Sequence, residues 1–219
     1  MNELRYTLLS DGSSDRALIP ILTWLLQQHL LDCALQNEWA DLARLPNPPQ
    51  DFPDRIRQTL ELYPCDLLFV HRDAESESRE TRRDEIMDAW EKAAGSATAS
   101  SAVCVIPVRM TEAWLLFDLG AIRKAAGNPN GVIPLDLPPL QRLESLPDPK
   151  KDLYEVLLEA SELPGRRRKT FRVAERVHRV SEYIDDFSPL RQLSAFQGLE
   201  EDLRETIRRN RWEGGTQSA

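Results

Sequence analysis

The chain has 219 residues, of which 41% are hydrophobic and 29% charged, with only nine glycines. This length and composition predict a folded domain with a substantial core and argue against a collagen-like, low-complexity or disordered chain. No apolar run approaches the roughly 20 residues that a membrane helix needs, and the N-terminus lacks the layout of a signal peptide, so we expect a cytoplasmic protein. The three cysteines, Cys33, Cys65 and Cys104, are far apart and support neither a disulfide framework nor a zinc site.

The net charge of −8 argues against a general nucleic-acid coat protein, which needs a basic surface. The charge is unevenly distributed: residues 1–149 hold 14 Lys/Arg and 23 Asp/Glu, whereas residues 150–211 hold 14 and 12. The acidic part is suited to holding a metal ion, and the C-terminal part is suited to meeting an anion.

Apolar patterns predict strands and helices in alternation up to residue 118. Strands are expected at residues 5–10, within 31–42, at 66–71 and at 102–108. Helices are expected after Ser13, over about 53–62 and 78–94, and from Thr111, whose hydroxyl is expected to cap the helix. Strands that alternate with long helices predict an α/β fold with a mostly parallel sheet and helices on both faces.

Strand signals stop after Asp118, and the rest of the chain has the pattern of amphipathic helices. These helices are expected over about 149–161, 170–184 and 189–209. We therefore predict an α/β core at residues 1–118, a C-terminal helical extension packed on it at 119–211, and a flexible tail at 212–219.

Acidic residues follow three of the predicted strands. Asp11 follows the first strand, Asp73 and Glu75 follow the buried third strand, and Glu112 follows the last. The carboxyl ends of parallel strands lie on one edge of a sheet, where ligands usually bind, so we expect these four carboxylates to converge. Such a cluster is stabilised by a divalent cation, and oxygen ligands favour Mg²⁺ or Mn²⁺.

Each acid also has a simpler interpretation. Asp11 with Gly12 has the composition of an ordinary turn, and Glu112 that of a favourable acid in the first turn of a helix. Asp15 is interpreted in the same way, as a charge that favours a helix N-terminus. The Asp73 and Glu75 pair carries more weight, because it comes directly after a buried apolar strand.

Other site chemistries have little support in the sequence. It contains no phosphate-binding Gly-x-x-x-x-Gly-Lys, no Gly-x-Gly-x-x-Gly and no Gly-x-Ser-x-Gly motif. Nothing marks a histidine base for Ser10 or Ser13, which argues against nucleophilic catalysis. His71 and His178 have no cysteine or histidine partners at ligand spacing, so both are interpreted as structural.

Four segments together resemble a known family: Leu8–Asp15, Phe69–Glu75, Ile106–Asp118 and Asp148–Lys151. They are similar to the Toprim domain of topoisomerases, primases and OLD-family nucleases, and more specifically to an uncharacterised bacterial family of small Toprim-like proteins. The resemblance spans most of residues 5–160. The stretch from Glu112 to Leu116, followed by Asp118 and a later Pro149-Lys150, is its more specific part.

The resemblance implies roles for particular residues. Asp11 matches the family's first-strand glutamate, and Asp73 and Glu75 match its metal-binding Asp-x-Asp, so these three would hold Mg²⁺ or Mn²⁺. Asp11 is one methylene shorter than the family's residue, which leaves metal binding more strongly supported than catalysis at this position. With Glu112 as a fourth catalytic residue, the implied activity is phosphodiester cleavage by a nuclease-like enzyme.

The resemblance also implies partners. Similar proteins are encoded beside ATPases and are associated with phage defence, which implies an ATPase partner. Nucleic acid is the implied substrate, and five basic side chains are candidates to bind its phosphates: Lys150, Arg166, Arg167, Arg168 and Lys169. The last four repel one another unless an anion or an acidic surface meets them.

Two other interpretations stay open. A non-catalytic Toprim-like module, which binds or regulates, fits the substitution at Asp11 and the acidic overall charge. A receiver-like domain also has acids at strand ends, but it expects a lysine after the final strand, where this chain has Arg109 and Glu112. We rank it last.

Overall fold

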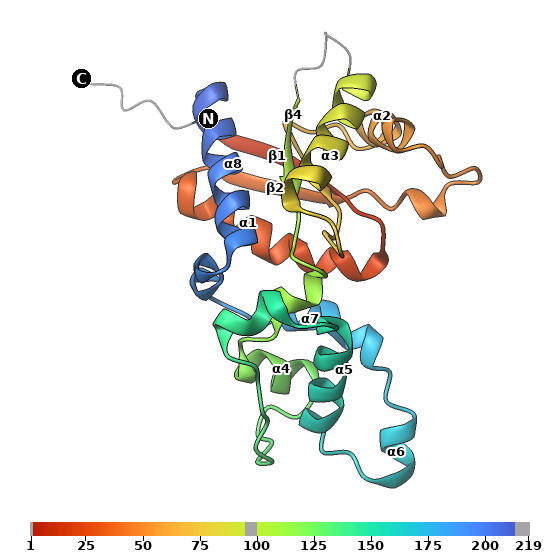
Figure 1. The fold of residues 1–219 in the computed structure, drawn as a ribbon, viewed down its shortest axis with the longest axis vertical. Coiled ribbons are helices and arrows are strands. Elements are labelled where there is room, and N and C mark those ends of the chain that lie inside the picture. The colour runs from red at the N-terminus through yellow and green to blue at the C-terminus, as the bar shows by residue number, and fades with distance from the viewer. Residues whose placement is uncertain (1, 95–99, 213–219) are drawn as a thin grey trace.

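The computed structural model describes residues 2–94 and 100–212. Within them the chain forms a four-stranded, all-parallel sheet with helices around it, which confirms the predicted α/β class (Figure 1). The strands are β1 (Glu3–Leu9), β2 (Ala34–Trp39), β3 (Leu67–His71) and β4 (Ser101–Val105), in the order β2-β1-β3-β4. Apart from Trp212, the predicted tail lies outside the described residues.

Apolar residues bury both faces of the sheet. On one face Leu68 and Val70 of β3 pack with Ile56 of α2 (Phe52–Leu62) and Ile86 of α3 (Arg79–Ala94). On the other face, Phe69 and its neighbours pack against α1 (Leu18–His29). All five residues of β3 are buried, as expected of a central strand covered on both sides.

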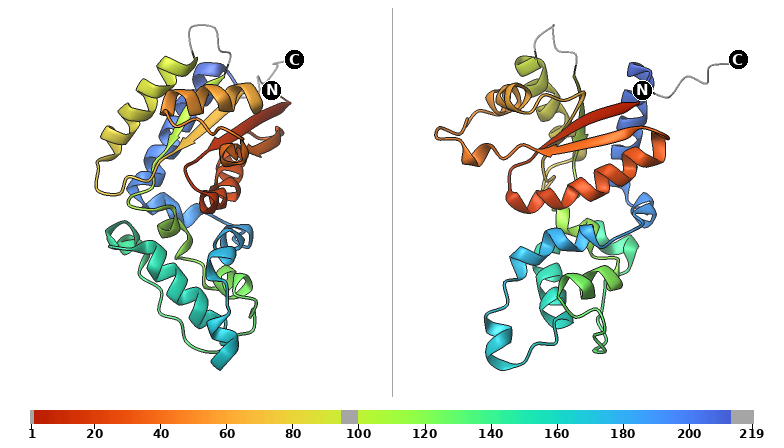
Figure 2. Two further views of the ribbon diagram at one scale, coloured as in Figure 1. Left: turned by 90° about the vertical axis from the view of Figure 1, so that its right-hand side faces the viewer. Right: turned by 180° about the vertical axis from the view of Figure 1, so that it is seen from behind.

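Four helices form what we call the helical lobe, next to the sheet (Figures 1 and 2). They are α4 (Leu119–Ala125), α5 (Pro149–Ala160), α6 (Gly165–Lys169) and α7 (Val177–Glu182). Buried residues of α4, α5 and α7 belong to the same continuous core as β1 and α1. The lobe is therefore held to the sheet by shared apolar packing, which fixes its position relative to the strand ends.

The last helix, α8 (Ser194–Asn210), returns to the sheet beside β4 (Figure 1). Arg79 of α3 binds Asp202 of α8 at 2.6 Å, and Asn210 donates a hydrogen bond to Ser101 at the start of β4. No helix within the described residues is long and apolar enough to cross a bilayer.

The segment after β4 differs from the expected helix. A short 3₁₀ helix spans Thr111–Leu115, and α4 begins only after Asp118, whose carboxylate accepts a hydrogen bond from the Ala121 amide. Thr111 does not cap a helix, because its amide and hydroxyl face His71 and Asp73 instead.

Candidate functional site

The candidate site lies where the strand order reverses, between the carboxyl ends of β1 and β3. The connection from β1 to β2 runs through α1 on one face, and the next two connections run through α2 and α3 on the other. In open parallel sheets such a switch point leaves a crevice in which ligands bind. The register pairs Leu9 with Val70, so the segment after Leu9 lies beside His71 and Asp73.

His71 is the centre of a buried polar network. Its Nε2 lies 3.0 Å from the Thr111 hydroxyl and 3.2 Å from Asp73 Oδ1, and its Nδ1 lies 3.4 Å from Asp15 Oδ2. The Thr111 amide donates to the same Asp73 oxygen at 3.0 Å. The imidazole is thus held between two carboxylates from different strand ends, and these contacts fix the position of Asp73.

This network shifts the pKa values of its members. Burial alone would lower the pKa of His71, but the close contacts and negative charges of Asp15 and Asp73 outweigh burial and raise it to about 9. Burial acts to raise the pKa of Asp15, and contacts with His71 and the Gly12 amide reverse the effect, so the net change is downward. Both shifts favour a protonated imidazole beside an ionised Asp15 at neutral pH.

Asp15 reaches the network because the chain turns tightly after β1. A 3₁₀ helix at Ser13–Ala17 follows Gly12, and the Gly12 amide donates to Asp15 Oδ2 at 2.9 Å. The side chain is almost completely buried. The sequence pattern alone indicates only that Asp15 favours a helix N-terminus. Asp15 also lies three residues after Gly12, which is the spacing of a capping box, and this spacing indicates a side chain that folds back toward the strand end.

Glu112 lies beside this network and is also buried. Its side chain is only 6% exposed, and its closest cationic atom, Lys150 Nζ at the start of α5, is 3.9 Å away. Burial is the largest influence and raises the pKa of Glu112. A backbone hydrogen bond and the charge of Lys150 oppose the rise, and the charges of Asp73 and Asp15 add to it. The charges of Asp73 and Asp15 therefore both act on Glu112, and we call these three side chains the carboxylate cluster.

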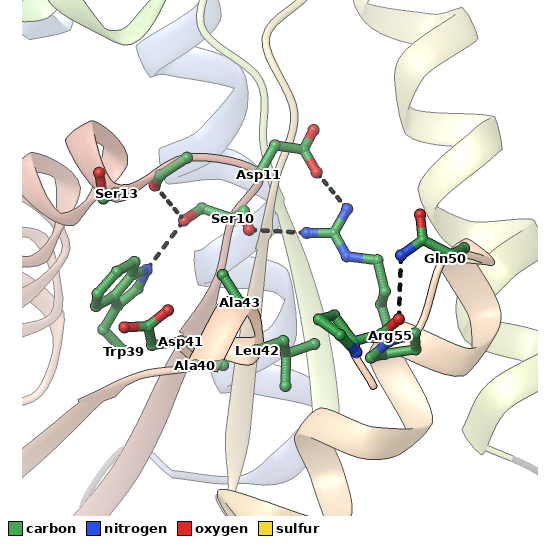
Figure 3. A pocket seen from close by; sticks show the side chains of 13 residues that line it. Ser10, Asp11, Ser13, Trp39, Ala40, Asp41, Leu42, Ala43, Gln50 and Arg55 are labelled. Carbon is green, nitrogen blue, oxygen red and sulfur yellow. Dashed lines mark hydrogen bonds and ion pairs between the residues drawn. The ribbon is translucent and has the colours of Figure 1, made fainter. Parts of the chain in front are cut away.

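Asp11 lies apart from the carboxylate cluster. Its side chain is 49% exposed and pairs with Arg55 of α2 and, at 3.6 Å, with Arg72. Arg55 also donates to the Ser10 carbonyl at 2.8 Å, so one guanidinium holds the backbone and side chain of the turn (Figure 3). Asp11, which the sequence predicts to be a metal ligand, therefore binds arginine side chains in the structure.

The Asp11 and Arg55 pair lines a pocket of about 380 Å³ at the ends of β1 and β2 (Figure 3). Trp39, at the end of β2, forms part of its wall and donates a hydrogen bond from Nε1 to Ser10 Oγ at 3.1 Å. The bond fixes the position of the indole ring.

Glu75 also points away from the carboxylate cluster. It has a positive φ of 55°, and its amide donates to the Arg109 carbonyl at 3.3 Å. The left-handed backbone turns its side chain outward, where it is 67% exposed and lies 3.5 Å from Arg82. Of the two acids after β3, only Asp73 enters the network.

The predicted basic residues are also divided. Lys150 lies at the carboxylate cluster, whereas Arg166–Lys169 form α6, whose side chains are all exposed. Figure 2 shows α6 at the end of the helical lobe farthest from the sheet.

A divalent cation at this site would draw its oxygen donors from few protein side chains. In residues 2–94 and 100–212, no three His, Cys, Asp or Glu side chains are grouped so that they hold a metal ion. Mg²⁺ is commonly bound by one or two carboxylates, with waters and substrate phosphates as its other ligands. Asp73, which keeps a solvent-facing side, and Glu112, whose pKa the charge of Asp73 helps to raise, are two oxygen donors that match this smaller requirement.

Comparisons with family models, curated proteins and solved structures find no match to this chain. The Toprim resemblance therefore stays a prediction from the sequence motifs.

Proposed function

We propose that the carboxylate cluster is the active site of a Mg²⁺- or Mn²⁺-dependent enzyme that hydrolyses phosphodiester bonds. The supporting observation is Glu112, a buried carboxyl beside Asp73 and Asp15 whose closest cationic atom is 3.9 Å away. Buried charges are normally paired closely or coordinate a metal. A divalent cation at this point would add to the compensation that Lys150 and a backbone hydrogen bond supply.

Asp73 and Glu112 are the residues proposed to hold the cation. Asp73 is 28% exposed, so its free edge is open to solvent. When bound, the ion would activate a water molecule and offset charge on the phosphate. Asp11 and Glu75, which are bound to arginines, are assigned no ligand role in this proposal.

The surrounding residues have distinct tasks in the proposed reaction. Lys150, exposed on its outer side, binds a phosphate oxygen next to Glu112. His71 keeps one Asp73 oxygen in place through Nε2, while Asp15 holds the other side of the ring. A group that orients a ligand in this way typically contributes 10–100-fold to metal affinity or activity.

Nucleic acid is the proposed substrate. The exposed cations of α6 would bind its backbone at a distance from the carboxylate cluster. An ATPase partner and a role in phage defence remain predictions from the motif resemblance.

A nuclease assay tests the proposed activity. The full chain would be incubated with end-labelled DNA and RNA, single- and double-stranded, in Mg²⁺, in Mn²⁺ and in EDTA. We expect cleavage only with metal, and a loss of about 100-fold or more in Asp73→Asn. A wild-type protein that binds metal and nucleic acid without cleavage would instead support the non-catalytic module.

A further inference from the structure

A second pocket, of about 470 Å³, lies between the sheet and the helical lobe. Its walls come from the 3₁₀ helix after β1, the end of β2, the start of α5 and the segment that leads into α7. Two half-buried aromatic side chains, Trp39 and Tyr154, face it from opposite parts of the molecule, the sheet and the lobe. We call it the interlobe pocket.

The interlobe pocket combines aromatic rings with basic side chains and one acid, Glu175. Arg16, Lys150 and His178 line it together with Trp39 and Tyr154. Aromatic faces stack on nucleobases, and lysine or arginine side chains bind phosphate. A nucleotide presents both kinds of group within one ligand, whereas an inorganic anion would leave the rings unused.

The interlobe pocket adjoins the carboxylate cluster through two side chains. Lys150 lines the pocket and lies 3.9 Å from Glu112. Ser14, also in the pocket wall, donates to Asp15 Oδ1 at 3.4 Å. A ligand whose phosphate binds Lys150 is thereby placed next to Glu112.

We propose that the interlobe pocket binds one unpaired nucleotide, with its base against Trp39 or Tyr154 and its phosphate at Lys150. The hydrogen bond from Trp39 to Ser10 holds one ring ready for stacking. Bases inside a duplex are stacked on their neighbours and cannot offer a free face, so the pocket selects single strands or free nucleotides. This inference rests on the proposed function and assigns its substrate class.

Fluorescence anisotropy in EDTA, at fixed salt, tests the inference on the full chain without cleavage. The probes are fluorescein-labelled dT6, the same oligomer with abasic residues, and a labelled duplex; unlabelled thymidine 5′-monophosphate serves as competitor. The variants are Trp39→Ala, Trp39→Phe and Tyr154→Ala, with Tyr183→Ala as control, because Tyr183 is an exposed tyrosine of the lobe that does not line the pocket. Circular dichroism establishes that each variant is folded.

We expect dT6 to bind more tightly than the abasic oligomer or the duplex. Loss of the ring that stacks on the base, Trp39 or Tyr154, weakens dT6 binding about 10-fold, within the range for base stacking on an aromatic side chain. Trp39→Phe, which keeps an aromatic ring, and Tyr183→Ala change it little. Competition by the mononucleotide identifies a free nucleotide as a sufficient ligand, and its absence identifies the strand as the ligand. Equal binding of the abasic oligomer, or unchanged binding in both folded alanine variants, would overturn the inference.

Different experimental results would contradict the nucleotide pocket and the proposed enzyme activity. Ring-dependent binding without metal-dependent cleavage would support the nucleotide pocket and contradict the enzyme. Metal-dependent cleavage of duplex DNA that is unaffected by Trp39→Ala and Tyr154→Ala would support the enzyme and contradict the pocket.

Discussion

Two pairs of acids at the same edge of the sheet have opposite surroundings. Asp15 and Asp73 hold the buried His71 between them, next to Glu112. Asp11 and Glu75, only four and two residues away in sequence, are half or more exposed and bind arginines. A position after a strand brings an acid to the sheet edge, while the local turn decides whether its side chain enters the site.

The largest expected difference between the two groups is in stability. His71→Ala would leave Asp15 and Asp73 without their shared partner, and removal of one member of a buried ion pair typically costs about 3–5 kcal/mol. Asp11→Asn should cost no more than about 1 kcal/mol, since Asp11 is about half exposed and solvent screens the pair. Urea unfolding would give both free energies; equal losses would contradict the buried network.

The next difference concerns activity. Glu112→Gln removes the buried charge proposed to bind metal and should lower metal-dependent cleavage about 100-fold. Glu75→Gln alters an exposed carboxylate and should stay within about threefold of wild type, because that side chain lies outside the cluster. Initial cleavage rates of the two variants, measured under the same conditions, test this prediction. A larger loss of rate in Glu75→Gln than in Glu112→Gln would place the site at Glu75.

Stability should also depend on pH through His71. Because its pKa in the folded protein is raised from 6.5 to about 9, its charge stabilises the fold fully below pH 6.5, and this contribution is lost as the pH rises through 9. The lowered pKa of Asp15 affects stability in acid: its contribution to folding is lost as the pH falls below 3.8. The difference in unfolding free energy between wild type and His71→Gln should shrink from pH 6.5 to 9; a constant difference would rule out this charge.

A smaller effect is expected far from the carboxylate cluster. Arg167→Ala removes one exposed cation of α6 and should weaken single-strand binding only a few-fold. The slope of log K against log salt should become less steep by about 0.7, the value for one phosphate contact. Anisotropy titrations at several salt concentrations measure it, and an unchanged slope would remove Arg167 from the nucleic-acid surface.

Much of the fold could be predicted because it follows from apolar periodicity. The buried run ending at His71 marked the central strand, and the alternation of strands and helices gave the parallel sheet. Asp73 could be placed at the carboxyl edge of the sheet because it directly follows this strand. The lobe could be predicted as helical, but the pattern does not specify that α8 returns to β4.

The finer features of the site depend on backbone details that periodicity does not encode. The 3₁₀ turn after Gly12 carries Asp15 inward, and the positive φ at Glu75 carries that side chain outward. His71 has no histidine or cysteine partner in sequence, so its role emerges only when β1, β3 and the segment at Thr111 are brought together.

Calorimetric titration of Mn²⁺ and Mg²⁺ measures whether Asp73 and Glu112 bind a divalent cation. The proteins are the wild type, the double variant Asp73→Asn/Glu112→Gln and the matched control Asp11→Asn/Glu75→Gln, each established as folded by circular dichroism. We predict that wild type and control bind the metal and that the first double variant does not. Binding that survives in Asp73→Asn/Glu112→Gln and disappears in Asp11→Asn/Glu75→Gln would contradict the assignment of the site to the carboxylate cluster.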